Sequence, residues 1–99
     1  MQTQAQAKSE ALRAPARVMF ELAPEVLEEL ARGLPAAGVA AIDLQHCVEF
    51  DSSLIGVLLD LSRRAQASGA SLRLLNPSAN LRKLAKLYGV EELLFVDRD

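Results

Sequence analysis

The chain has 99 residues, of which 51% are hydrophobic and 4% aromatic, and its formal net charge is −2. A chain of this length forms one small domain with a single core, and a weak negative charge argues against nucleic acid as a partner. Cys47 is the only cysteine and His46 the only histidine, which excludes an internal disulfide and leaves no plausible zinc site.

Membrane and export signals are missing from the sequence. No apolar run reaches the roughly 18–20 residues of a membrane span, and residues 1–8 lack the apolar segment of a secretory signal. We therefore expect a cytoplasmic protein that does not insert into a membrane, and the lone cysteine fits a reducing compartment.

The first third of the chain predicts a leader, a strand and a helix. Residues 1–16 are rich in Gln and Ala, so we expect a loosely ordered leader or a short edge strand, with the domain proper over residues 17–99. Residues 17–22 have the pattern of a strand. A helix over about 24–34 follows, with Pro24 in its first turn and Gly33 near its end.

Strands and helices continue to alternate in the rest of the chain. Residues 39–44 and 70–75 are nearly continuous apolar runs, typical of strands covered on both faces. Helices are predicted over 52–68 and 77–88, the second with Asn76 as its cap and Pro77 in its first turn, and 93–96 reads as a short last strand. This alternation predicts an α/β fold with crossover helices and a largely parallel sheet.

Catalytic motifs are missing. His46 has no nucleophile at motif spacing, and the five glycines are scattered and never form a phosphate-binding loop. Asp43 and Glu49 are expected at a strand end and in a connecting loop, and His46-Cys47 is expected to pack locally where a strand closes. We therefore predict a non-enzymatic protein without a cofactor or metal.

The stretch Asp51-Ser52-Ser53 comes directly before an apolar helix and allows two interpretations. In the first, Asp51 or Ser52 accepts hydrogen bonds from the unpaired N–H groups of the helix start. In the second, Ser52 is a switch, because the amide groups and dipole of a helix start favour an added phosphate. Asp51 would repel that phosphate, so the modification would act by recruiting or rejecting a partner.

The pattern Asp51-Ser52-Ser53-x-Ile55-Gly56-Val57-x-Leu59, after a strand that ends Ile42-Asp43-Leu44, resembles the signature of STAS domains. That family includes bacterial anti-sigma factor antagonists, in which the motif runs Asp-Ser-Ser-Gly-Leu/Ile-Gly. The resemblance covers about residues 17–96. It implies a mixed, largely parallel sheet with helices mainly on one face, and it makes Ser52 the phosphoacceptor or a partner contact. Leu54 replaces the family's glycine, which would either hinder a kinase or offer a partner an apolar contact.

A second motif is similar to MlaB proteins, the STAS subunits of the MlaFEDB phospholipid ABC transporter. It reads Asn76-Pro77-x-x-x-Leu81-x-x-Leu84-Ala85-x-Leu87-Tyr88-Gly89-Val90. Tyr88 is either a core residue at the helix end or a surface contact. Arg82, Lys83 and Lys86 form either a solvated face or a basic rim for an acidic partner.

These resemblances imply a regulatory subunit that binds and stabilises an MlaF-like cytoplasmic ATPase and lies at the inner membrane when in complex. The alternative is an anti-sigma factor antagonist that a partner kinase phosphorylates on Ser52. The expected partner-binding residues are Asp51, Ser52, Ser53, Leu54, Arg82, Lys83, Lys86 and Tyr88.

Overall fold

A three-stranded parallel sheet, in the order β1-β3-β5, is the framework of the protein. The computed structural model describes residues 11–95. Its strands are β1 (Leu12–Arg13), β3 (Gly38–Asp43) and β5 (Ala70–Leu75). The 15-residue helix α3 (Ser53–Ala67) connects β3 to its neighbour β5, which is the kind of crossover that parallel strands need. The predicted α/β fold with a largely parallel sheet is confirmed.

A second parallel pair, β2 (Arg17–Val18) with β4 (Glu49–Phe50), continues the line of β1 and β3. Between the two pairs, the Val48 N–H donates to the Ala16 carbonyl at 3.0 Å. The predicted strand over 17–22 is wrong beyond Val18, because the Leu22 N–H donates to the Met19 carbonyl at 2.8 Å and closes a turn. Glu49, expected in a loop, belongs to β4.

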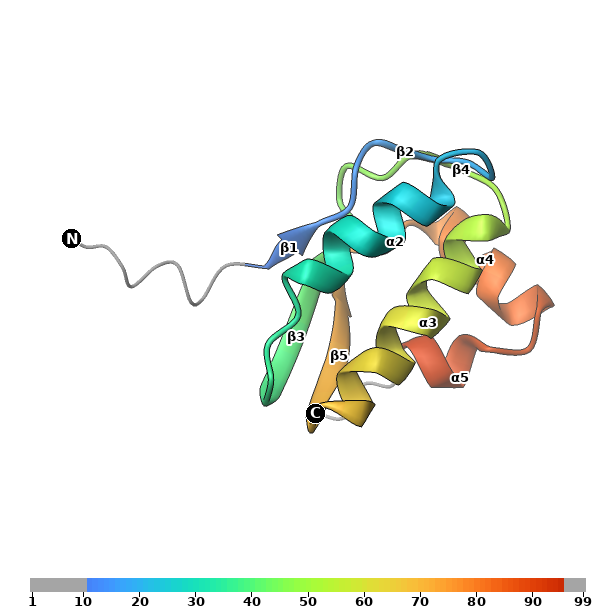
Figure 1. Cartoon of the computed structure of the whole chain (residues 1–99). Helices are drawn as coiled ribbons and strands as arrows, with labels where there is room; N and C mark the ends of the chain where they lie inside the picture. Colours follow the sequence, from blue (N-terminus) through green and yellow to red (C-terminus); the bar gives the residue numbers. More distant parts are fainter. Residues whose placement is uncertain (1–10, 96–99) are drawn as a thin grey trace.

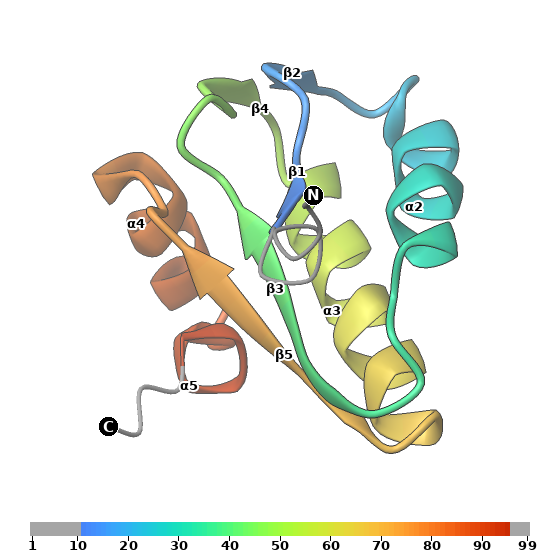
Figure 2. The same cartoon turned by 90° about the vertical axis from the view of Figure 1, so that its left-hand side faces the viewer.

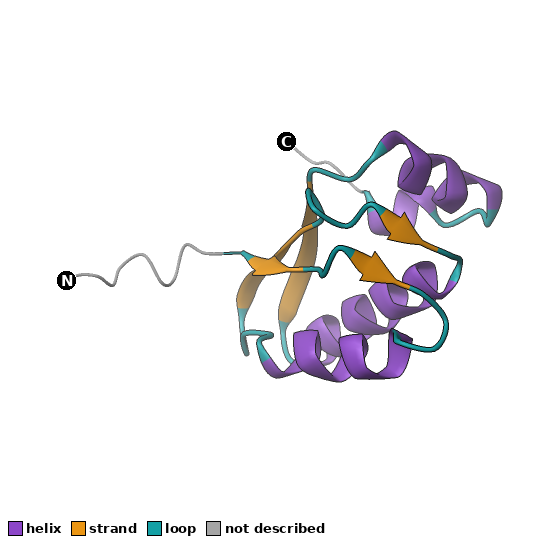
Figure 3. Ribbon diagram, turned by 90° about the horizontal axis from the view of Figure 1, so that it is seen from above, coloured by secondary structure: helices purple, strands orange, loops and turns teal. Residues whose placement is uncertain are grey.

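The helices α2 (Ala23–Arg32), α3, α4 (Ala79–Leu87) and α5 (Glu91–Leu94) all lie on one side of the three-stranded sheet (Figure 1). Figure 2 faces the side of the sheet that carries no helices, and Figure 3 is seen from above; both show the same arrangement. The expectation of helices mainly on one face is confirmed. Within residues 11–95 one face of β3 is buried and the other is open, since Ile42 is fully buried while Val39 is 60% exposed. The expectation that the leader or a partner covers this second face stays a prediction.

The core between sheet and helices is built from aliphatic side chains. Burying a leucine or isoleucine completely contributes about 1.5–3 kcal/mol relative to leaving it exposed. The largest fully buried side chains are Val18, Ile42, Leu44, Leu54, Leu58, Leu61 and Leu81. Three of them, at 54, 58 and 61, come from one face of α3, so this helix is fixed firmly against the sheet.

The beginning of α4 differs from its predicted form. The cap is Ser78, whose Oγ accepts from the Leu81 N–H at 3.1 Å, whereas Asn76 was predicted as the cap. Asn76 instead has a positive φ of 56° and donates from Nδ2 to Asp43 Oδ1 at 3.1 Å. The helix therefore begins at Ala79, later than expected.

The last strand, predicted over 93–96, is wrong for the residues that the structure describes. The Val90 N–H donates to the Ala85 carbonyl at 2.9 Å, which turns the chain back directly after α4. The helix α5 follows, with Leu94 buried and Leu93 67% exposed. Val96 lies outside the described residues. In residues 11–95 no helix has both the length and the apolar character needed to cross a membrane.

Candidate functional site

Asp51 ties the start of α3 to the turn before α2. Its Oδ1 accepts from the Ser53 N–H at 2.9 Å and its Oδ2 from the Phe20 N–H at 3.0 Å. The hydrogen bond from Ser53, with a smaller contribution from Phe20, holds the pKa of Asp51 below its usual value. Asp51 thus supplies the side-chain cap of α3.

Ser52 occupies the cap position of α3 without capping it through its side chain. Its backbone is already helical, with φ −65° and ψ −13°, and its hydroxyl forms no capping hydrogen bond. The side chain is exposed. The hydroxyl at this helix start is therefore free to meet another molecule, and the role of Ser52 in binding remains a prediction.

Leu54 does not belong to this exposed surface. Its side chain is 0% exposed and is part of the core cluster. The expectation that Leu54 contacts a partner is therefore wrong, because the first turn of α3 directs this position inward. For the same reason Leu54 does not obstruct access to Ser52.

A hollow of about 390 Å³, here called the Lys83 hollow, lies between the start of α3 and α4. Asp51 and Ser52 line it on one side, and Lys83 and Leu87 line it on the other. Within residues 11–95, Lys83 forms no ion pair, so its ammonium group is open to an acidic ligand. The structure thus brings Asp51, Ser52 and Lys83, which belong to two separate sequence motifs, to the same hollow.

A second hollow, of about 540 Å³, lies between α2 and α3 and is here called the Phe20 hollow. Its lining is mostly apolar and includes Phe20, Leu27 and Val57. Ser53 lines it as well, so the Asp51-Ser52-Ser53 stretch forms a polar ridge with one hollow on each side. A ridge of this kind is suited to recognising a protein surface that has both polar and apolar groups.

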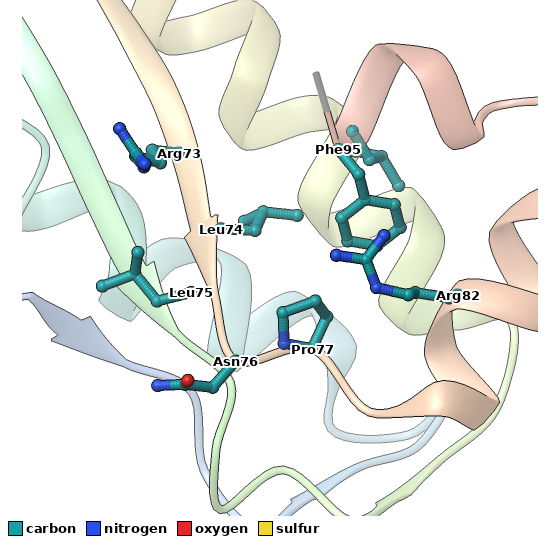
Figure 4. A pocket seen from close by; sticks show the side chains of 8 residues that line it. Arg73, Leu74, Leu75, Asn76, Pro77, Arg82 and Phe95 are labelled. Atoms are coloured by element: carbon teal, nitrogen blue, oxygen red, sulfur yellow. The ribbon is translucent and has the colours of Figure 1, made fainter. Parts of the chain in front are cut away.

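The other residues predicted to contact a partner are Arg82, Lys86 and Tyr88. Arg82 lies over the ring of Phe95, 4.8 Å from its centroid, and lines a third hollow of about 290 Å³ beside β5. Figure 4 shows Arg73 and Arg82 on opposite sides of Leu74, so the two guanidinium groups do not converge on one ligand. Lys86 is exposed and Tyr88 is 54% exposed at the end of α4. Arg82, Lys83 and Lys86 are all exposed on α4, and the basic rim that they would form for an acidic partner stays a prediction.

Three exposed apolar residues around the ridge were missed by the sequence analysis. Phe20 is 76% exposed, Val48 73% and Leu87 78%, and each lines one of the two hollows. The exposure of Leu87 could have been predicted, because this residue falls outside the stripe of buried apolar positions on α4. Nothing in the sequence indicated that Phe20 and Val48 are exposed, since apolar residues beside a short strand are normally buried.

The chain's histidine and cysteine, His46 and Cys47, do not form a reactive site. Cys47 is 2% exposed, and this burial raises the pKa of its thiol, which favours the unreactive protonated form. His46 is exposed in the loop between β3 and β4, rather than closing a strand as expected. Within residues 11–95 no group of three His, Cys, Asp or Glu side chains is placed to hold a metal.

The described chain is a crossover α/β domain in which an exposed serine marks the start of a largely buried helix. A family model described as "Mlab, STAS domain" matches residues 1–96. The chain therefore belongs to this family of MlaB-like STAS domains, as the two sequence motifs indicated. Comparisons with curated proteins and with solved structures each gave no significant match.

Proposed function

We propose that the protein is a non-enzymatic regulatory subunit that binds and stabilises the cytoplasmic ATPase of a phospholipid ABC transporter. The observation that carries the proposal is the match to the MlaB-like STAS family, which extends over residues 1–96. The exposed ridge at Ser52 is the surface that contacts the ATPase. Phospholipid is the cargo of the assembly and not a ligand of this chain, which lies at the inner membrane only through its partner.

The test is co-expression with ABC ATPase subunits encoded in the same genome, followed by affinity purification of this chain. We expect an ABC ATPase to co-purify with the wild type and to be lost with Leu87→Asp, which places a charge beside Ser52. Val39→Asp is the matched control, because Val39 is 60% exposed and alternates along β3 with the buried Ala40 and Ile42, which places it on the sheet face opposite the helices. Recovery of a kinase-like anti-sigma factor in place of an ATPase would refute the proposal.

One observation favours a second function, that of an anti-sigma factor antagonist. The Ser52 hydroxyl is exposed and uncommitted, and the buried Leu54 does not block it. Incubation with ATP and a partner kinase would then add the mass of one phosphate. The shift should disappear in Ser52→Ala and persist in Ser53→Ala, and an unchanged mass in the wild type would exclude this alternative.

A further inference from the structure

Neither a steric contact nor the backbone conformation within residues 11–95 explains why position 56 is a glycine. It lies in the first turns of α3, where glycine is about 1 kcal/mol less favourable than alanine. A Cβ atom built on Gly56 would meet no atom within 4 Å, and its backbone φ is not positive. By contrast, a Cβ on Gly33 would come within 2.5 Å of the Leu12 side chain. An alanine would therefore fit at position 56 and strengthen the helix.

Gly56 lines the Phe20 hollow, which is where an additional side chain would protrude. Phe20, Leu27 and Val57 surround this space with apolar surface, and Phe20 is 76% exposed. An exposed phenylalanine beside a bare stretch of helix is unfavourable in an isolated chain and favourable when another surface covers both. Because Ser53 lines the same hollow, any molecule that covers Gly56 also reaches the Ser52 ridge.

The charges of the Phe20 hollow indicate the chemistry of its occupant. Its charged lining groups are carboxylates, Glu21 and Asp60. Asp60 already binds Arg63 at 3.2 Å and Arg64 at 3.0 Å. Within residues 11–95, Glu21 pairs only with Arg17, at 3.5 Å, and its side chain is 63% exposed. Glu21 is thus the acidic group that remains open to a basic side chain.

We propose that a helix of the ATPase packs across α3 at Gly56, inserts an apolar side chain into the Phe20 hollow, and places a lysine or arginine beside Glu21. This inference rests on the proposed function and specifies how the partner is held. The distance between packed helices depends on the side chains at their contact, so the missing Cβ of Gly56 allows a close approach. Gly56 thus makes the free domain less stable than an alanine would, and it lets the partner helix approach α3 more closely.

The test measures folding and binding on the same variants, with the ABC ATPase that co-purifies with the wild type as the probe. Gly56→Ala should raise the melting temperature by about 4 °C, because 1 kcal/mol shifts a domain of this size by about 4–8 °C. The same variant should bind the ATPase about tenfold more weakly in titration calorimetry, and Gly56→Leu about a hundredfold more weakly. Glu21→Lys should lose about tenfold through charge reversal.

Ala67→Leu is the matched control. It places the same leucine side chain at an exposed position on α3, eleven residues or about 16 Å along the helix. We expect wild-type affinity from it. If the wild type binds the ATPase and Gly56→Leu binds equally well, this inference is wrong while the proposed function stands. If the wild type binds no ATPase, both are wrong.

A stable Gly56→Ala variant keeps the test independent of folding defects. If Gly56→Leu fails to fold, the alanine variant decides, because its Cβ meets no atom of the described chain. Equal affinity of Gly56→Ala and the wild type would then overturn the inference. Weaker binding by a variant that melts at a higher temperature would support it, since no general loss of structure produces both effects.

Discussion

Removing the hydroxyl of Ser52 should separate binding from folding. A helix cap is worth about 0.5–2 kcal/mol, but here the Ser53 N–H is bound by Asp51 at 2.9 Å and not by Ser52. Ser52→Ala keeps that bond, keeps a backbone that is already helical, and removes only an exposed hydroxyl. We therefore expect a change of less than about 0.5 kcal/mol in the free energy of unfolding, the range of ordinary surface substitutions.

The expected effect of Ser52→Ala on binding is larger. A hydrogen bond contributes about 0.5–1.5 kcal/mol, and more when its loss leaves the partner's group buried and unpaired. Because 1.4 kcal/mol is a factor of ten, affinity for the ATPase should fall about tenfold or more. Ser52→Glu should bind more weakly still, since it places a carboxylate next to Asp51 in a contact shaped for a hydroxyl.

Urea denaturation and titration calorimetry on the same preparations measure both quantities. The melting temperature of Ser52→Ala should stay within about 4 °C of the wild type. A stability loss above 1 kcal/mol with unchanged affinity would mean that Ser52 is an ordinary cap after all, and that the reasoning from its uncommitted hydroxyl is mistaken.

Three further predictions follow from neighbouring residues. Leu54→Ala should destabilise the domain by about 2–5 kcal/mol in urea denaturation, since it opens a cavity in the core; a loss below 1 kcal/mol would contradict its burial. Because the folded-state pKa of Asp51 lies below 3.8, its ionised form stabilises the fold above that pH, and this stability is lost as pH falls through the lowered pKa. The gap in urea midpoint between the wild type and Asp51→Asn should therefore narrow from pH 7 to pH 3, and a constant gap would refute the linkage. Lys83→Glu should weaken ATPase binding about tenfold in calorimetry while Arg73→Glu, the same charge change in the third hollow, should not; equal losses would indicate a general charge effect.

The spacing of apolar residues and the glycines at element ends predicted the long helix and strands well. β3, β5 and α3 lie within one or two residues of their expected bounds, because each has a continuous apolar pattern and a glycine near one end. The segments around Phe20 and Leu93 were misassigned as strands. Both are short apolar runs, and such runs do not distinguish a strand from a turn or a single helical turn.

The ridge itself was easier to predict than its surroundings. Asp51, Ser52 and Ser53 are consecutive, so their presence at a helix start follows from sequence alone. The hollows on either side combine residues from α2, α3 and α4 with the loop before β4, and only the fold brings these together. Leu54 shows the reverse case, since it follows the exposed Ser52 closely in sequence while its own position on the helix points into the core.

The two hydrogen bonds of Asp51 have a consequence for genetic studies of this protein. One carboxylate holds both the first turn of α3 and the turn that presents Phe20. A screen for loss of partner binding would therefore select Asp51 variants readily, even though both side-chain oxygens face the protein's own backbone. Suppressor mutations of such variants should arise within this chain, at positions that restore the turn or the helix start. Suppressors of Ser52 variants should arise in the gene of the partner.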